Sequence, residues 1–199
     1  MYQNSCKNKY NSGLTLIELL VVISIFAIIT SIAIFNYGKF NSSSSLQNLA
    51  DDIALTIRKA QGYAVGVRGV GEDFNYGYGI HFTADSSTFI LFTDIVSSSG
   101  YNDGGVGVCG EPEVGNECLE MLNIISADKI ESIFLNDESE KNNIDIVFKR
   151  PNSEPTFCYD GSCSNPVSYV KIKISNIANP EIYKFVTIFN NGQISVLNE

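Results

Sequence analysis

The stretch Ser12-Gly13-Leu14-Thr15-Leu16-Ile17-Glu18 opens an apolar run that continues to Phe35. A short leader containing Lys7 and Lys9, and no acidic residue, precedes it. The run contains neither Gly nor Pro, and as a helix its 22 residues span about 33 Å, enough to cross a ~30 Å hydrocarbon core. The sequence therefore predicts one transmembrane helix near the N-terminus, with the leader on the cytoplasmic side because of its lysines.

Two residues at the start of this run are unusual for a plain membrane anchor. Glu18 is ionisable, and a charge inside a membrane segment is costly enough to be a functional hypothesis by default. Gly13 is a small residue placed before the apolar run, whereas a secretory signal is cut after its apolar run and loses it. A cut after Gly13 keeps the apolar segment in the mature protein.

This arrangement resembles the prepilin signal of type IV pilins and type II secretion pseudopilins. The resemblance implies that a prepilin peptidase cuts between Gly13 and Leu14 and methylates the new N-terminus, where the family most often has Phe. It also implies that Glu18, the fifth mature residue, pairs with the N-terminal amine of a neighbouring subunit during assembly. The alternative role for Glu18 is a carboxylate that lies near the membrane interface and reaches water.

Two other kinds of processing stay open. Ser31-Ile32-Ala33 is a small-x-small triplet, so an ordinary signal peptidase would cut after Ala33. The apolar run is long for a signal, whose apolar region is typically ~7–15 residues, and it contains a glutamate. An uncleaved single-span anchor is the other alternative, and it leaves the spacing of Gly13 and Glu18 as a coincidence.

The net charge limits the partners. The 199-residue chain carries a formal charge of −9, and removal of Lys7 and Lys9 with the leader gives −11. Nucleic acid is therefore an unlikely partner, because Lys and Arg clusters supply the affinity for it. A DNA-uptake role remains the alternative if the fold gathers the basic residues into one patch: Arg68, Lys149, Arg150, Lys171 and Lys173.

The pattern of apolar residues divides the chain into four parts. We expect a leader at 1–13, a transmembrane and filament-core helix at 14–36, an amphipathic helix at 37–66 and a β-rich head domain at 67–199. The amphipathic helix is predicted because its apolar residues recur at intervals of three and four. These residues are Leu46, Leu49, Ala50, Ile53, Ala54, Ile57, Ala60 and Ala64. The polar stretch around 36–45 marks the membrane exit.

The head is predicted to be an antiparallel β-sheet. From Tyr76 onward apolar residues alternate with polar ones, and Asn191-Gly192 is a strong hairpin signal. The expected strands are Tyr76–Thr83, Phe89–Phe92, Ile130–Leu135, Ile144–Lys149, Tyr169–Ser175, Tyr183–Phe189 and Ile194–Leu197. The predicted fold class is α+β, a long N-terminal helix packed on this sheet, as in pilins. The segments 77–82, 89–94 and 192–196 also resemble the H-type (GspH/FimT-like) minor pseudopilins.

Four cysteines remain after the leader is removed. They allow three connectivities, and we favour Cys109–Cys118 with Cys158–Cys163 because each bond closes a short loop. Disulfides are expected in an exported domain. A zinc site is the alternative, but the spacings lack the C-x2-C pattern of zinc knuckles.

No cofactor and no enzymatic activity are expected. Asp94, Asn102 and Asp103 offer oxygen ligands for calcium, although their spacing fits no EF-hand loop and a solvated turn accounts for them. His81 is the only histidine, and alternation places it on the strand face opposite Ile80 and Phe82. No Ser or Cys nucleophile accompanies it in the sequence, which favours a histidine on the surface of the sheet.

The sequence thus predicts a minor pilin or pseudopilin. Its expected partners are the prepilin peptidase, the membrane and other pilin subunits bound through the N-terminal helix. Its expected location is the cytoplasmic membrane, crossed once with the head exported, and later the pilus or pseudopilus. A membrane-anchored hydrolase would need a catalytic constellation that the sequence does not present.

Overall fold

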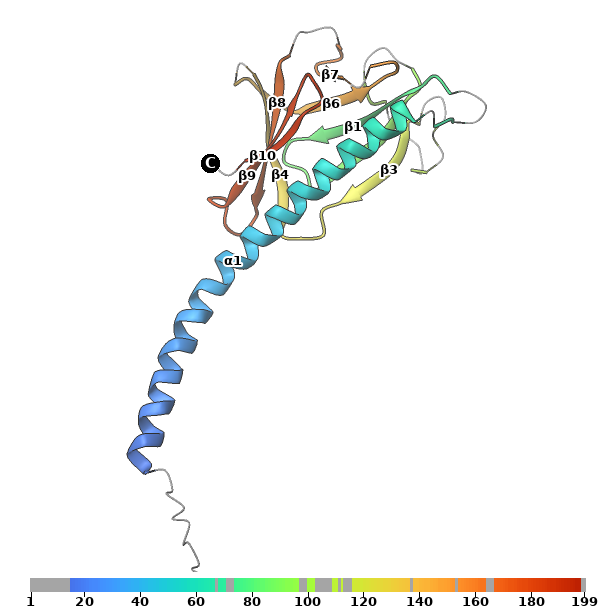
Figure 1. The fold of residues 1–199 in the computed structure, drawn as a ribbon. Helices are drawn as coiled ribbons and strands as arrows, with labels where there is room; N and C mark the ends of the chain where they lie inside the picture. Colours follow the sequence, from blue (N-terminus) through green and yellow to red (C-terminus); the bar gives the residue numbers. More distant parts are fainter. Residues whose placement is uncertain are drawn as a thin grey trace, which may run out of the picture. The chain divides into compact units, whose positions relative to one another are not determined.

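The computed structural model describes residues 15–66, 68–70, 74–96, 100–102, 109–110, 112, 116–136, 138–152, 154–163 and 167–197. Helix α1 (Leu16–Val65) comes first, and all the strands follow it in the chain (Figure 1). The chain divides into two units, Met1–Asn41 and Ser42–Glu199. The first unit contains the apolar part of α1, and the second contains the rest of α1 and the head.

The strands form two antiparallel sheets rather than the single sheet expected from the sequence. The first sheet has the order β3-β2-β1-β6-β7, and the second has the order β10-β9-β8-β4-β5. The first sheet comprises β1 (Gly77–Thr83), β2 (Thr88–Asp94), β3 (Cys118–Asn123), β6 (Asn143–Phe148) and β7 (Pro155–Cys158). The second comprises β4 (Asp128–Leu135), β5 (Glu140–Lys141), β8 (Tyr169–Asn176), β9 (Tyr183–Phe189) and β10 (Ile194–Leu197). An isolated bridge between Ser86 and Ile130 connects the two sheets.

The core of the head lies between the later part of α1 and both sheets. The predicted apolar stripe of α1 is buried there, with Leu46, Ile53 and Ile57 completely inaccessible to solvent. Inward-facing residues of both sheets belong to the same cluster, for example Ile80 of β1 and Ile172 of β8. Figure 1 shows this part of α1 running alongside β1 and β3 of the first sheet. The helix thus contributes a side chain to this core every three to four residues, and each strand contributes every second side chain.

A buried polar contact fixes the second sheet to α1. Asp128, at the start of β4, accepts hydrogen bonds from the Ser45 hydroxyl (2.5 Å) and from the Asn176 side-chain amide (2.7 Å). Asp128 is completely inaccessible to solvent, and a buried polar group needs such hydrogen-bond partners. Ser45 lies one residue before the buried stripe begins, and the contact therefore fixes where α1 enters the core.

The Asn191-Gly192 pair lies in the predicted hairpin turn. Residues 190–193 connect β9 and β10 through a hairpin, with Gly192 at φ 82°. Gly192 donates its backbone N–H to Phe189 and Phe189 donates to Gln193, both at 2.9 Å. Glycine suits this position because other residues rarely adopt a positive φ.

Candidate functional site

The residue that the sequence marks for assembly, Glu18, lies in the first turn of α1 and closes a capping box with Thr15. The Glu18 Oε2 accepts the backbone N–H of Thr15 (3.0 Å) and the Thr15 hydroxyl (2.9 Å). In return the Thr15 Oγ1 accepts the backbone N–H of Glu18 at 3.3 Å. This is the reciprocal Thr-x-x-Glu pattern that satisfies orphan amides at a helix start. The Thr-x-x-Glu spacing is visible in the sequence, but the cap is a further role for Glu18 besides the subunit contact and the interfacial carboxylate expected above.

The cap leaves Glu18 able to bind another group. Both hydrogen bonds from Thr15 reach the same oxygen, Oε2, and an ionised carboxylate has about four acceptor positions. Within the described part of the chain, no hydrogen bond or ion pair reaches Oε1 of this exposed side chain. Glu18 therefore combines a role in its own helix with free capacity for a donor from elsewhere.

The rest of the apolar segment presents its side chains outward on all sides. From Leu16 to Ile34, large apolar side chains are between 48% and 82% exposed, and this segment is long and apolar enough to cross a membrane. Ser24 and Thr30 do not interrupt it, because their hydroxyls donate to the carbonyls of Leu20 and Phe26 at 2.8 Å. These two hydroxyls are thus satisfied within the helix, and the segment leaves its apolar surface for lipid or for other helices.

The predicted processing site, Gly13 and Leu14, lies outside the described residues, as does the leader. Both predicted disulfides are present in the structure. Cys109 bonds Cys118 with a Cα–Cα distance of 4.8 Å, and Cys158 bonds Cys163 with a Cα–Cα distance of 4.0 Å.

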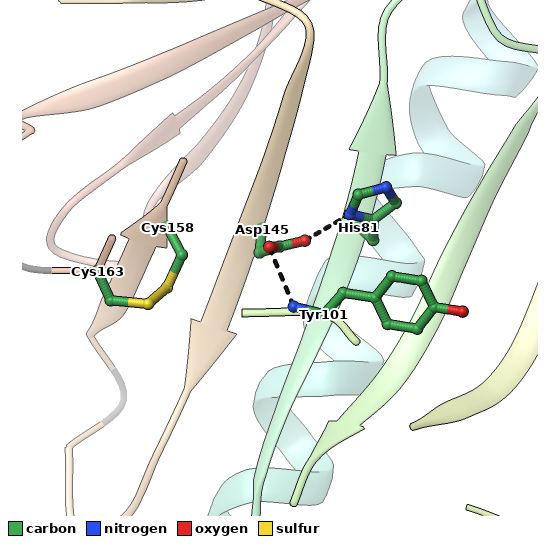
Figure 2. Close-up of a disulfide and its surroundings, with 5 residues drawn as sticks. All are labelled: His81, Tyr101, Asp145, Cys158 and Cys163. Carbon is green, nitrogen blue, oxygen red and sulfur yellow. Dashed lines mark hydrogen bonds and ion pairs between the residues drawn. A yellow bond between two sulfur atoms is a disulfide. The ribbon is translucent and has the colours of Figure 1, made fainter. Parts of the chain in front are cut away.

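His81 faces away from the core as alternation predicts, but its partner was not predictable from the sequence. Its Nδ1 lies 2.6 Å from Oδ1 of Asp145 on the neighbouring strand β6, and its Nε2 lies 3.0 Å from the Thr83 hydroxyl. The other oxygen of Asp145 accepts the backbone N–H of Tyr101 at 3.1 Å (Figure 2). The Tyr101 ring lies 4.9 Å from the imidazole. His81 and Asp145 therefore hold the segment at 100–102 against the outer face of the first sheet.

A buried carboxylate that the sequence does not mark lies near the residues considered as calcium ligands. Glu117 is completely inaccessible to solvent and accepts backbone N–H groups from Ile95 (2.9 Å), Val96 (3.0 Å) and Asn102 (2.8 Å). Burial raises the pKa of Glu117 above its usual value, the three amides oppose this, and the charge of Asp94 adds to it.

Glu117 thus organises the loop in which the sequence placed calcium ligands. Asp94 is buried at the end of β2, and Asp103 lies outside the described residues. In the ranges that the structure describes, no cluster of three or more His, Cys, Asp or Glu side chains is arranged for a metal ion. Calcium binding stays the untested alternative to a solvated turn.

The five basic residues that would form a DNA-binding patch are distributed over both sheets. Lys171 and Lys173 lie on β8 of the second sheet, whereas Lys149 and Arg150 directly follow β6 of the first. The Arg68 guanidinium lies over the Tyr63 ring of α1 at 4.3 Å. Lys173 is also paired with Glu131 at 2.8 Å.

Comparison with known proteins assigns the N-terminal segment to a class. Residues 8–34 match the prokaryotic N-terminal methylation motif. No curated protein matches the chain. Among solved structures, the type IV minor pilin FimU of Pseudomonas aeruginosa (strain PAO1) aligns over 78% of this chain and 90% of its own, at 10% identity and a TM-score of 0.40.

The methylation motif spans Gly13, Glu18 and the apolar run, and it ends before the head. It characterises the N-terminal segment and says nothing about the head. A motif of this kind implies processing by a prepilin peptidase and assembly with other pilins.

Proposed function

We propose that this chain is a minor pilin or pseudopilin, a structural subunit of a type IV pilus or a type II secretion pseudopilus. The observation that carries the proposal is the N-terminal methylation motif over residues 8–34. In this proposal the prepilin peptidase cuts between Gly13 and Leu14, and the head is exported while α1 anchors the chain in the cytoplasmic membrane. Disulfides in the head and a lysine-bearing leader support this orientation.

Assembly then exchanges lipid for neighbouring helices around the apolar segment. Lipid tails are as apolar as a partner helix, so association relies on close packing and on polar pairs rather than on the hydrophobic effect. Glu18 is the only ionisable side chain between Thr15 and Ile34. A contact from its carboxylate to the N-terminal amine of a neighbour therefore sets the register of the two helices.

The capping box supports this role for Glu18. An unpaired carboxylate in hydrocarbon is costly, and the two donors of Thr15 reduce that cost while the subunit waits in the membrane. Because Oε1 keeps its acceptor positions, the incoming amine adds to the cap and does not have to replace it.

The experiment that tests processing is intact mass with N-terminal sequencing after co-expression with a prepilin peptidase. We expect a chain that begins at methylated Leu14. Gly13→Glu should block the cut, and Ser12→Ala is the matched control that should be cut normally. A chain that begins at Ile34, an uncut chain, or normal maturation of Gly13→Glu would refute the proposal.

Assembly is tested separately with variants of Glu18 that keep the cut. Glu18→Ala and Glu18→Gln should be processed like the wild type, and both should enter filaments less often because neither can form an ion pair with an amine. Ser24→Ala removes a hydroxyl from the same helix and should assemble normally. Immunoblots of sheared filaments measure incorporation, and a wild-type yield for Glu18→Ala would exclude the role of Glu18.

DNA uptake remains the alternative function, and the acidic charge of the mature chain disfavours it. A gel-shift assay of the mature chain with duplex DNA at low salt distinguishes DNA uptake from a purely structural role. A DNA-binding pilin would retard the duplex, and its affinity for the duplex would fall as the salt concentration rises.

A further inference from the structure

The outer face of the second sheet carries an aromatic surface that lies outside the proposed assembly contacts of α1. On β8, Tyr169, Lys171 and Lys173 alternate with buried valine and isoleucine, and on β9 Phe185 and Phe189 face the same way. Tyr169 and Phe189 are direct neighbours across the strands, with ring centroids 5.9 Å apart. These side chains are only partly buried. The face is therefore flat, aromatic and open to a ligand.

A shallow pocket of about 230 Å³ lies on this face. It is smaller than the roughly 300–1,000 Å³ typical of sites for drug-sized ligands, which suits a single ring. Its lining residues combine three aromatic rings, one aliphatic side chain and two opposite charges. They are Phe134, Leu135, Glu138, Tyr169, Lys171 and Phe185.

The two charged residues of the pocket are available to a ligand. The Lys171 ammonium lies 5.7 Å from the ring centroids of both Tyr169 and Phe185, which holds it between the aromatic walls. Over the part of the chain that the structure describes, neither Lys171 nor Glu138 forms an ion pair. Lys173 on the same strand differs, because Glu131 neutralises it.

Backbone hydrogen bonds in the turn around Glu138 hold this residue in place beside the pocket. Glu138 has φ 61°, a left-handed conformation that is unusual for a residue other than glycine. Its backbone N–H donates to the carbonyl of Leu135 at 2.8 Å, and Leu135 donates to Ser139 at 3.1 Å. The Asn136 side chain accepts the backbone N–H of Ser168 at 3.4 Å, which ties this turn to the start of β8.

We propose that this pocket binds one ring of a saccharide. A pyranose offers a face of C–H groups that packs on aromatic rings, here Phe134, Tyr169 and Phe185. Its hydroxyl groups both donate and accept hydrogen bonds. They can therefore donate to the Glu138 carboxylate and accept from the Lys171 ammonium. A nucleic acid fits less well, because its phosphates would meet the Glu138 carboxylate in a chain of net charge −9. This inference does not depend on the filament function.

The test uses the full chain in detergent with three named probes, cellohexaose, chitohexaose and sialyllactose, followed by saturation-transfer NMR and titration. At least one should receive saturation at its ring C–H protons. Tyr169→Ala and Lys171→Ala should each weaken its binding by about tenfold or more. Tyr183→Ala and Lys173→Ala change an aromatic residue and a lysine on the same face outside the pocket, and should bind like the wild type. Near-UV circular dichroism checks that each variant is folded.

Three results would overturn the proposal. They are no transfer to any of the three saccharides at millimolar concentration, equal losses in the pocket variants and their controls, and tighter binding of a single-stranded oligothymidine than of every saccharide.

Discussion

Helix α1 contains two regions of similar length that use apolar residues in opposite ways. From Leu16 to Ile34 the apolar residues lie on all sides of the helix and are exposed. From Leu46 to Ala64 they form a single stripe, and the stripe is buried in the core of the head. The difference shows that the environment of a helix can be read from the distribution of its apolar residues, since a helix that is apolar all round needs lipid or other helices, and a striped one needs a protein core.

The same contrast holds for carboxylates. Glu18 lies in the apolar region and accepts hydrogen bonds from one neighbour in sequence, Thr15. Glu117 lies inside the head and accepts three backbone amides from residues that are 15 to 22 positions away. A helix end can satisfy a carboxylate locally, whereas a buried one in the head requires the tertiary fold.

The largest expected effect comes from the same substitution in the two regions of α1. Ile53→Ala removes a completely buried side chain and should lower the free energy of unfolding of the head by about 2–5 kcal/mol. Ile29→Ala removes an exposed one and should leave it unchanged. Denaturant unfolding of both variants in detergent, followed by near-UV circular dichroism, measures this difference. An equal loss of stability in the two variants would contradict the assignment of the two regions of α1 to different environments.

The next largest expected effect comes from the Asp128 contact, which lies where the buried region of α1 begins. Asp128→Ala leaves the Ser45 hydroxyl and the Asn176 amide without their shared acceptor, which should lower the free energy of unfolding by about 1–3 kcal/mol. Asp160→Ala is the matched control, because Asp160 forms an exposed ion pair with Lys141 that is worth under about 1 kcal/mol. Urea titrations compare the two, and a smaller loss for Asp128→Ala than for Asp160→Ala would contradict the role of this anchor.

The disulfides should matter for the head and not for the apolar segment. Replacing both Cys158 and Cys163 by serine removes a bond across a sequence separation of 5, and should lower the free energy of unfolding by about 2 kcal/mol. Processing and membrane retention should stay unchanged, which cell fractionation checks. A failure of membrane retention in a folded variant would show that the two regions are coupled.

The smallest expected effect is the pH dependence of stability that the buried Glu117 carboxylate contributes. Because the pKa of Glu117 is raised in the folded head, the folded state takes up its proton before the unfolded state does. Stability should therefore rise as the pH falls from neutrality towards about 4.3, the usual pKa of glutamate, with a slope of at most about 1.4 kcal/mol per pH unit. Glu117→Gln should remove this slope. A flat profile for the wild type over the same pH range would show that Glu117 does not titrate there.

Local patterns in the sequence predicted many of the elements correctly. The seven expected strands, the hairpin at Asn191-Gly192 and the striped helix all appear in the structure. Three strands were missed: β3, β5 and β7. Each is an edge strand, and β7 begins with Pro155, which an edge tolerates and a central strand does not. The edge strand β10 was predicted because the Asn191-Gly192 turn signal precedes it, whereas β5, with two residues, is too short to show alternation.

The sequence by itself determined the apolar segment, the Thr15–Glu18 cap, the buried stripe and most of the strands. All of these depend on residues a few positions apart, whose periodicity follows from helix and strand geometry. Only the tertiary structure decided that the strands form two sheets, that His81 meets Asp145, that Glu117 organises a loop, and that Lys171 lies between two rings. These contacts join residues that are far apart in the sequence or on separate strands. They depend on which distant strands become neighbours in a sheet, and no local pattern specifies that order.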